Sequence, residues 1–210
     1  MPEHKPSGFR KILIASGNPG KLKEFKALFQ DSSVEMLSQL EFDVREAAET
    51  GTTYVENAII KARNGCEQTQ LPCIADDSGL EVDALQGQPG VRSARFAGDD
   101  ADDGMNNAKL LSALSGITDP DRTARFRCVL VFMRYESDPA PIIAEGVLPG
   151  KIIEQHRGRG GFGYDPIFQP MGYEVTNAEM PSAEKNRISH RGIAMTNLFQ
   201  ILTEKYPEIL

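Results

Sequence analysis

The sequence contains no apolar segment long enough to cross a bilayer. Its longest apolar run, Cys128 to Met133, is six residues between Arg127 and Arg134, whereas a transmembrane helix needs about 20. Residues 1–10 are polar, and the apolar segment that follows covers only Ile12 to Ala15, so no cleavable signal peptide is expected. We therefore expect a cytoplasmic protein with no membrane partner.

Cysteine is also scarce. The three cysteines, Cys66, Cys73 and Cys128, are odd in number, far apart and set in apolar surroundings. This pattern argues against disulfides and a zinc site, and it predicts buried free thiols.

Positive charge is in short supply. Lys and Arg number 23 against 30 Asp and Glu, which gives a formal net charge of −7. A chain of this charge is not expected to bind nucleic acid unless it has a dedicated basic face. A small polyanionic substrate would therefore need locally placed lysines and a metal ion.

What is present is enough apolar material for one sizeable core, or for two lobes that share one sheet, since 40% of the 210 residues are hydrophobic. Apolar spacing predicts strands at Lys11–Ala15, Val34–Leu37, Thr123–Tyr135 and Ile142–Leu148, the last two as a hairpin. It predicts helices at Leu22–Phe29, Tyr54–Gln68, Met105–Leu114 and Ile193–Lys205.

One further apolar run ends abruptly in polar residues. Leu71 to Ala75 is typical of a buried strand, and Asp76, Asp77, Ser78 and Gly79 follow it. Successive strand residues face opposite sides, so the two aspartates can converge on one ligand only if the chain turns there, as a Ser-Gly pair allows. We expect a strand end at which the carboxylates hold a hard cation. An Asx-type turn or a helix N-cap would explain the same residues.

A polar loop, Ser16 to Lys21, joins the first predicted strand to the first helix. Such a loop leaves backbone N–H groups free at a helix N-terminus, a geometry that favours phosphate. Lys21 opposes the helix dipole at the helix start, and a bound phosphate would resolve that conflict. An ordinary βα turn is the alternative, and the spacing is not that of a P-loop.

The second predicted helix begins with a capping-box pattern, Thr53 and Glu56. Asn57 and Lys61 lie four residues apart on one face of that helix, which either looks into a site or is solvated. Glu49 precedes the helix in a Gly-Thr loop of a kind that can carry a metal ligand.

The acidic run Asp99–Asp103 resembles a metal-binding cluster. It directly precedes a predicted helix, however, and an acidic run there complements the helix N-terminus. We therefore leave these aspartates out of the site.

The last third of the chain carries a glycine-rich segment, Arg157 to Phe168. Its glycines favour a backbone that a ligand can approach closely, with Phe162 available to stack on a base and Asp165 to accept from a ring N–H. A flexible surface loop is the alternative.

A donor-rich patch follows. Ser189 is predicted to cap the final helix, which puts His190 and Arg191 in its first turn, where positive charge opposes the dipole unless an anion or a carbonyl is bound. A lone histidine is usually structural, but the combination with Lys185 favours a binding role.

Five separated motifs together resemble the inosine triphosphate pyrophosphatase family, and closely its bacterial dITP/XTP pyrophosphatase branch. The resemblance runs from Lys11 to about Leu202 and follows the family's order. Its motifs are Ser16-Gly17-Asn18 with Lys21; Glu49-Thr50-Gly51 with Glu56-Asn57-Ala58 and Lys61; Ala75 to Leu80; Gly161 to Phe168; and Ala183-Glu184-Lys185 with Ser189-His190-Arg191.

This resemblance implies an enzyme that hydrolyses non-canonical purine nucleoside triphosphates, such as ITP, dITP and XTP, to monophosphate and pyrophosphate. It implies Mg²⁺ as cofactor and a homodimer. The implied fold is a two-lobed α/β structure around a long mixed β-sheet flanked by helices, with the site in the cleft between lobes. Residues 11–210 would form this single catalytic domain, and residues 1–10 would be an extension without an assigned role.

The resemblance also implies roles for individual residues. Asp77 would accept the proton of the attacking water, and Glu49 and Asp77 would hold magnesium, with Asp76 as a further candidate. The triphosphate would contact Ser16, Gly17, Asn18, Pro19, Gly20, Lys21 and Lys61, and Ser78 would contact the substrate. The base pocket would comprise Phe162, Gly163, Tyr164, Asp165, Lys185, His190 and Arg191.

In that pocket, donors would meet the 6-oxo group of hypoxanthine or xanthine. Adenine presents an amino donor there and would leave the pocket donors unpaired, so it should be rejected. Guanine is harder to exclude on this argument.

Two alternatives stand beside this hypothesis. One is a pyrophosphatase relative of the Maf type, which usually carries Ser-Pro-Arg-Arg after the first strand, where this chain has Ser16-Gly17-Asn18-Pro19-Gly20-Lys21. The other is a catalytically silent nucleotide-binding module, which the carboxylates Glu49 and Asp77 disfavour.

Overall fold

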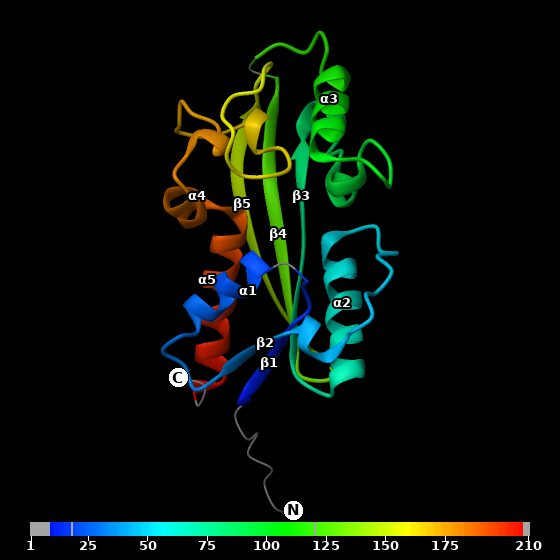
Figure 1. Cartoon of the computed structure of the whole chain (residues 1–210), viewed down its shortest axis with the longest axis vertical. Coiled ribbons are helices and arrows are strands. Elements are labelled where there is room, and N and C mark those ends of the chain that lie inside the picture. The colour runs from blue at the N-terminus through cyan, green and yellow to red at the C-terminus, as the bar shows by residue number, and fades with distance from the viewer. Residues whose placement is uncertain (1–8, 18, 120, 208–210) are drawn as a thin grey trace, which may run out of the picture. The chain divides into compact units, whose positions relative to one another are not determined.

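A computed structural model describes residues 9–17, 19–119 and 121–207 (Figure 1). Its strands form one six-stranded sheet with the order β2-β1-β3-β4-β5-β6. The strands are β1 (Lys11–Ile14), β2 (Glu35–Ser38), β3 (Cys73–Val82), β4 (Thr123–Met133), β5 (Ile142–Ile152) and β6 (Phe168–Pro170). β1 pairs in parallel with β2 and β3, whereas β5 and β6 are antiparallel. The expected α/β class with a mixed sheet is thereby confirmed.

The helices agree with the expected segments, with one addition. They are α1 (Pro19–Leu28), α2 (Tyr54–Thr69), α3 (Asp103–Ala113), α4 (Ser182–Ile188) and α5 (His190–Lys205). α2 begins with the predicted capping box, and the Oγ of Ser189 accepts from Gly192 N at 3.0 Å, as expected of a cap for α5. The short helix α4 is the addition. No helix of the described ranges is long and apolar enough to span a bilayer.

The chain divides into two compact units. The first unit takes its described residues from Met1–Asp77, Val129–Glu145 and Ala194–Leu210, and the second from Ser78–Cys128 and Gly146–Ile193. The chain therefore passes from one unit to the other inside β3, β4, β5 and α5, never in a loop.

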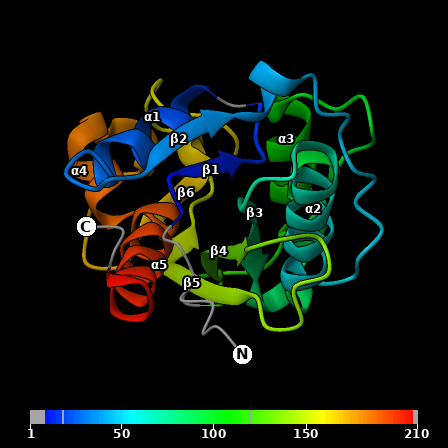
Figure 2. The same ribbon diagram turned by 90° about the horizontal axis from the view of Figure 1, so that it is seen from below.

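In the first unit, α2 and α5 lie on opposite sides of the strands (Figures 1 and 2). Ile12, Leu13 and Ile14 of β1 are buried in the core. Phe199 of α5 packs edge-on against Phe29 with ring centroids 5.0 Å apart, which ties the end of the chain to its beginning.

In the second unit, α3 packs its apolar face on the sheet. Leu110 and Leu114 are fully buried in one cluster with Leu80 and Val82 of β3. Phe168 of β6 belongs to the same cluster, so the glycine-rich segment ends in the core of this unit rather than on its surface.

The strand that carries Asp76 and Asp77 does not end where we expected. β3 runs without a turn from Cys73 through Ser78 and Gly79 to Val82, so the expected strand end is wrong. β3 lies between β1 and β4 in the sheet, and its incorporation into the sheet overrides the local turn preference of a Ser-Gly pair.

The three cysteines are free and buried, as the sequence predicts.

Candidate active site

Asp77 is a buried carboxylate with a separate partner on each oxygen. Lys61 Nζ lies 3.0 Å from Oδ1, and Asn57 Nδ2 donates to Oδ2 at 3.2 Å. Only 7% of Asp77 is exposed. Burial raises the pKa of Asp77 above its ordinary value, although the bonds from Lys61 and Asn57 oppose that shift. Asp77 is therefore a better proton acceptor than a surface aspartate.

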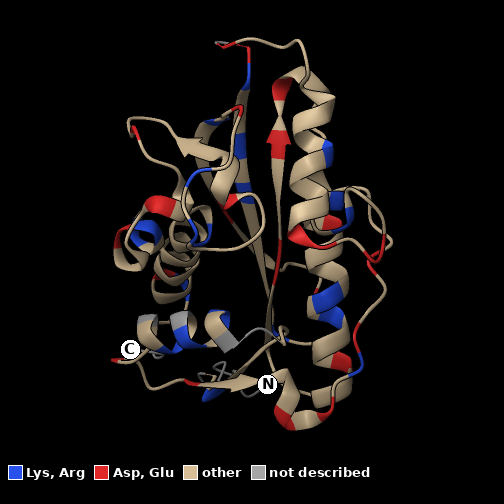
Figure 3. Ribbon diagram, turned by 45° about the horizontal axis from the view of Figure 1, so that its top comes forward, with Lys and Arg blue, Asp and Glu red and all other residues tan. Residues whose placement is uncertain are grey.

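Lys61 joins two carboxylates. Its Nζ lies 2.8 Å from Glu49 Oε1 and also pairs with the Asp77 carboxylate. Burial alone would lower the pKa of Lys61, but Asp77, Asp76 and Glu49 raise it, so the ammonium stays charged. Figure 3 shows Lys and Arg of α2 in blue and the acidic residues of β3 in red.

Asn57 links the catalytic candidate to the loop that carries Glu49. Its Oδ1 accepts from Gly51 N at 2.8 Å, while its Nδ2 reaches Asp77. Asn57 has no exposed surface, so the face of α2 that bears it looks into the protein and not into solvent. The capping box fixes the same loop, because Glu56 Oε2 accepts from the backbone N–H groups of Thr52 and Thr53.

Asp76 has a different partner. Both of its oxygens lie 2.7 Å from Lys21 Nζ. Because β3 is extended, neighbouring side chains point to opposite faces, which accounts for Asp76 meeting a lysine of α1 while Asp77 meets α2.

The donor set of the first unit fits one hard cation. No group of three or more His, Cys, Asp or Glu suited to a metal occurs among the residues that the structure describes. Glu49 and Asp77, however, already share one cationic partner, the Lys61 ammonium. Two carboxylates, completed by substrate phosphates and water, are a typical ligand set for Mg²⁺.

The expected phosphate loop leads into α1. Gly20 and Lys21 belong to the first turn of the helix, which contains no acidic residue. The N–H groups of that turn and the helix dipole favour an anion. Ser16 and Gly17 precede the helix; Asn18 lies outside the described residues, and Pro19 is the first residue of α1.

The second constellation is built around Asp165, which lies in the second unit and is 3% exposed. Its Oδ1 accepts from Asn177 Nδ2 at 3.0 Å, and its Oδ2 accepts from Phe162 N at 2.8 Å and pairs with Lys185 Nζ. Lys185 Nζ also lies 4.7 Å from the centroid of the Phe162 ring. Asp165 thus gathers an aromatic ring and an ammonium, the two groups expected of a base pocket.

Two residues of this loop have backbone roles. Gly161 has φ of +75°, and a Cβ there would clash with the Asp165 carboxylate, so the position requires glycine. The Tyr164 side chain is buried in the core, and its hydroxyl donates to Ser93 O at 2.8 Å. Tyr164 can therefore contact a ligand only through its backbone.

His190 and Arg191 begin α5, and both are half-buried. The His190 ring stacks on Phe126, with centroids 4.9 Å apart and planes at 12°. Phe126 in turn contacts Phe168 of the core at 4.6 Å. The aromatic stack fixes the imidazole of the second unit in one orientation.

Sequence reasoning missed three polar contacts to the glycine-rich loop. Asn177 holds Asp165, while Asp103 and Asn107 of α3 bind the peptide of Gly163. An asparagine inside a helix is a weak signal for Asn107. Asp103 lies in the first turn of α3 and Asp102 caps the helix by accepting from Met105 N, as expected of an acidic run before a helix, but the sequence gives no sign that Asp103 also contacts Gly163.

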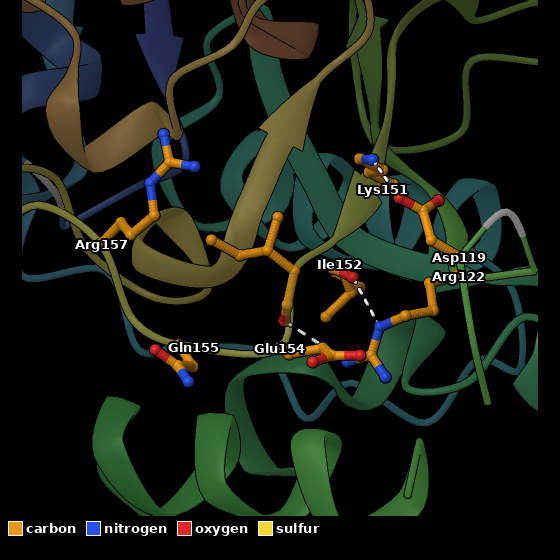
Figure 4. A pocket seen from close by; sticks show the side chains of 8 residues that line it. Asp119, Arg122, Lys151, Ile152, Glu154, Gln155 and Arg157 are labelled. Carbon is orange, nitrogen blue, oxygen red and sulfur yellow. Dashed lines mark hydrogen bonds and ion pairs between the residues drawn. The ribbon is translucent and has the colours of Figure 1, made fainter. Parts of the chain in front are cut away.

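A pocket of about 290 Å³ in the second unit contains none of the predicted site residues (Figure 4). Its cations are already engaged: Lys151 pairs with Asp119, and Arg157 with Glu179. The buried Arg122 donates to four backbone carbonyls, at Leu114, Ile117, Ile152 and Ile153. These contacts explain the pocket wall as structural.

Comparison with known proteins gives consistent relatives. The sequence model of the Ham1 family matches residues 12–201. A dITP/XTP pyrophosphatase of Vibrio parahaemolyticus is 52% identical over 194 residues, 92% of this chain and 97% of the relative. The solved structure of a HAM1 protein from Coxiella burnetii matches with TM-score 0.89 and 49% identity, covering 92% of this chain and 98% of that one. A Mycobacterium abscessus structure, described as a nucleoside-triphosphatase and dITP/XTP pyrophosphatase, matches with TM-score 0.77 and 44% identity over 90% and 98% of the two chains.

Proposed function

Because this chain belongs to the Ham1 family, we propose that it is a nucleoside triphosphate pyrophosphatase that removes non-canonical purine nucleotides. The substrates are dITP, ITP and XTP, and the products are the monophosphate and pyrophosphate. The observation that carries the proposal is the buried Asp77, with Lys61 and Asn57 on its oxygens and Glu49 on the same lysine. The names of the relatives, dITP/XTP pyrophosphatases, support the substrate class.

The first unit supplies the chemistry. The reaction breaks the anhydride bond between the α and β phosphoryl groups. The water oxygen bonds to the α-phosphorus, and pyrophosphate leaves with the bridging oxygen and its electron pair. Asp77 takes one proton from the attacking water, and the contacts from Lys61 and Asn57 hold the carboxylate that accepts it. Glu49 and Asp77 would hold Mg²⁺, which when bound neutralises charge on the triphosphate.

The lysines and the loop before α1 bind the phosphates. Lys61 and Lys21 are held on carboxylates by ion pairs and would transfer those contacts to phosphate oxygens. The N–H groups of Gly20 and Lys21 at the start of α1, together with Ser16, Gly17, Asn18 and Pro19, would surround the triphosphate. Asp76 is the partner of Lys21 in this proposal rather than a metal ligand.

The second unit supplies base recognition. Phe162 is 61% exposed, which leaves its ring open for stacking on a purine. Lys185, His190 and Arg191 would donate to the 6-oxo group, and Gly163, Tyr164 and Asp165 would shape the pocket wall. Ser78 of β3 would contact the substrate. An adenine amino group would leave these donors unpaired.

The first experiment measures pyrophosphate release with Mg²⁺ from dITP, XTP, dGTP and dATP, for the wild type and for Asp77→Asn. We expect release from dITP and XTP at least tenfold faster than from dATP, and a loss of about 100-fold or more in the variant, the size typical of general-base removal. Equal rates on all four nucleotides would refute the base pocket. An unaffected variant would refute the role of Asp77, and binding without turnover would favour the silent binding module.

The match to the Ham1 family disfavours the Maf-type alternative.

We further propose a homodimer, which rests on the family resemblance. Light scattering on the purified protein should then give twice the mass of one chain.

A further inference from the structure

The backbone of Gly163 is held at both its N–H and its C=O by one helix of the second unit. Asp103 Oδ2 accepts from Gly163 N at 2.6 Å, and Asn107 Nδ2 donates to Gly163 O at 3.0 Å. Asp103 and Asn107 lie four residues apart in α3 and therefore on the same face of the helix. A side-chain acceptor and a side-chain donor thus grip one residue of a loop that lies 56 residues or more further along the chain.

Capping of α3 does not require these contacts, although an acidic residue in the first turn also suits the helix dipole. Asp102 already caps the helix, since its Oδ1 accepts from Met105 N at 2.7 Å. Asn107 is 2% exposed in the middle of the helix, where asparagine has a low helix propensity. The buried asparagine in particular requires another reason, and its bond to the loop supplies one.

The loop is anchored on both sides of the aromatic ring it displays. On one side the N–H of Phe162 itself donates to Asp165 Oδ2. On the other side Gly163 is held by α3, in a backbone conformation with φ of +60° that side chains disfavour. Between these anchors the Phe162 side chain is exposed, with Lys185 Nζ 4.7 Å from its ring centroid.

We infer that Asp103 and Asn107 are positioning residues that fix the Phe162 ring and the Gly163 peptide for recognition of the purine base. The inference deepens the proposed function and rests on it. Neither residue needs to touch the substrate. By holding the peptide between them they keep the ring in one place, so the stacked base meets the donors of the pocket without first ordering the loop.

The test uses four variants of the full chain. Asp103→Ala removes the acceptor from an exposed position and should not disturb folding. Asp103→Asn keeps a side-chain oxygen that can still accept from Gly163 N, and serves as the conservative rescue. Asn107→Ala removes the donor. Asp102→Ala is the matched control, because it takes an aspartate from the same helix start but leaves the loop contact intact.

The readout separates the base half of the substrate from the phosphate half. We expect Asp103→Ala and Asn107→Ala to raise KM for dITP about tenfold with little change in kcat, and to raise the inhibition constant of inosine monophosphate by a similar factor. Inhibition by inorganic pyrophosphate should stay within about twofold of the wild type. Asp103→Asn and Asp102→Ala should resemble the wild type in all three quantities.

An unchanged KM in Asp103→Ala would overturn the inference, and so would equal weakening of pyrophosphate and inosine monophosphate, which would indicate a general structural defect. If the wild type does not hydrolyse dITP but binds it, the same comparison is made with Kd. A wild type that neither hydrolyses nor binds dITP would refute the proposed function and this inference together. Activity in the wild type with an unaffected Asp103→Ala would refute the inference alone.

Discussion

Asp77 illustrates how a buried carboxylate is stabilised by polar partners. Water is largely excluded from it, which by itself would favour its protonated form. One cation and one amide compensate, and both come from α2. Removing Lys61 would take away a positive charge beside the carboxylate. Removing Asn57 would take away only a neutral hydrogen bond that orients the carboxylate.

Asn57 therefore allows a test of orientation alone. We expect Asn57→Ala to lower kcat for dITP about tenfold or more with little effect on KM, because Asp77 and the Gly51 loop lose the group that joins them. The free energy of unfolding should also fall by about 1–3 kcal/mol, the usual cost of a buried polar group left without its partner. Steady-state kinetics and urea unfolding measure the two effects.

The control for this variant is Asn64→Ala. Asn64 belongs to the same helix, and its amide donates to Arg45 O on the surface of the first unit. The change in helix propensity is the same, so any loss of kcat shared by both variants would mean that the effect comes from the helix and not from Asp77.

At the scale of elements, the turn between β4 and β5 is built around one aspartate. Asp138 is 4% exposed, accepts from Arg134 Nε at 2.8 Å, and also accepts from the backbone N–H groups of Arg134 and Ala140. The hydrogen bonds from Arg134, reinforced by that of Ala140, lower the pKa of Asp138 to about 2, against burial that would raise it. The hairpin that apolar spacing predicts here is thus closed by a group that no periodicity reveals.

Asp138→Asn should lower the free energy of unfolding by about 2 kcal/mol at neutral pH, the equivalent of this pKa shift. Because the pKa of Asp138 is lower in the folded state, the ionised carboxylate stabilises the fold at pH values above its unfolded pKa, near 3.8. That contribution is lost as the pH falls toward 2. The difference between variant and wild type should therefore shrink across this window in urea unfolding. Glu136→Gln, an exposed change in the same turn, is the control, and an equal loss of stability in it would contradict the assignment to Asp138.

Elements also mark where sequence reasoning succeeds and fails. α2 could be predicted to within a residue because Thr53 and Glu56 form a local capping signal. β3 could not, because its continuation through Ser78 and Gly79 depends on neighbouring strands that local sequence does not show. α4 could not be predicted either, because it is only seven residues long and Pro181, at its N-cap position, makes no side-chain cap.

The candidate site divides in the same way. Glu49, Lys61 and Asp77 could be named from residue type and the family resemblance, and the structure places them in contact. Asp103 and Asn107 could not be connected to Gly163, because only the folded second unit brings α3 to that loop. Residues that act on a site from a distant segment carry no local signature of that role.

At the scale of the whole molecule, the buried thiols report on unfolding. Cys73 belongs to the first unit and Cys128 to the second, and both have no exposed surface. Because the chain passes between the units inside three strands and a helix, we expect both thiols to become reactive in one transition.

A water-soluble disulfide reagent added across a urea series measures this. The variants are made in a Cys66→Ala background, because Cys66 is a second buried thiol of the first unit. Native protein should react only slowly, and Cys73→Ala and Cys128→Ala in that background should show reactivity with the same midpoint. Two separate midpoints would mean that one unit opens while the other stays folded, and would contradict a single cooperative transition.

The interrupted route of the chain has a consequence during synthesis. The first unit includes α5 from Ala194 on, where Leu198 and Leu202 are fully buried and Phe199 packs on Phe29. The second unit is complete once residue 193 has been made. In a nascent chain, the early segments of the first unit therefore lack their packing against α5 until that helix has left the ribosome. The synthesis of the first unit begins before that of the second and ends after it.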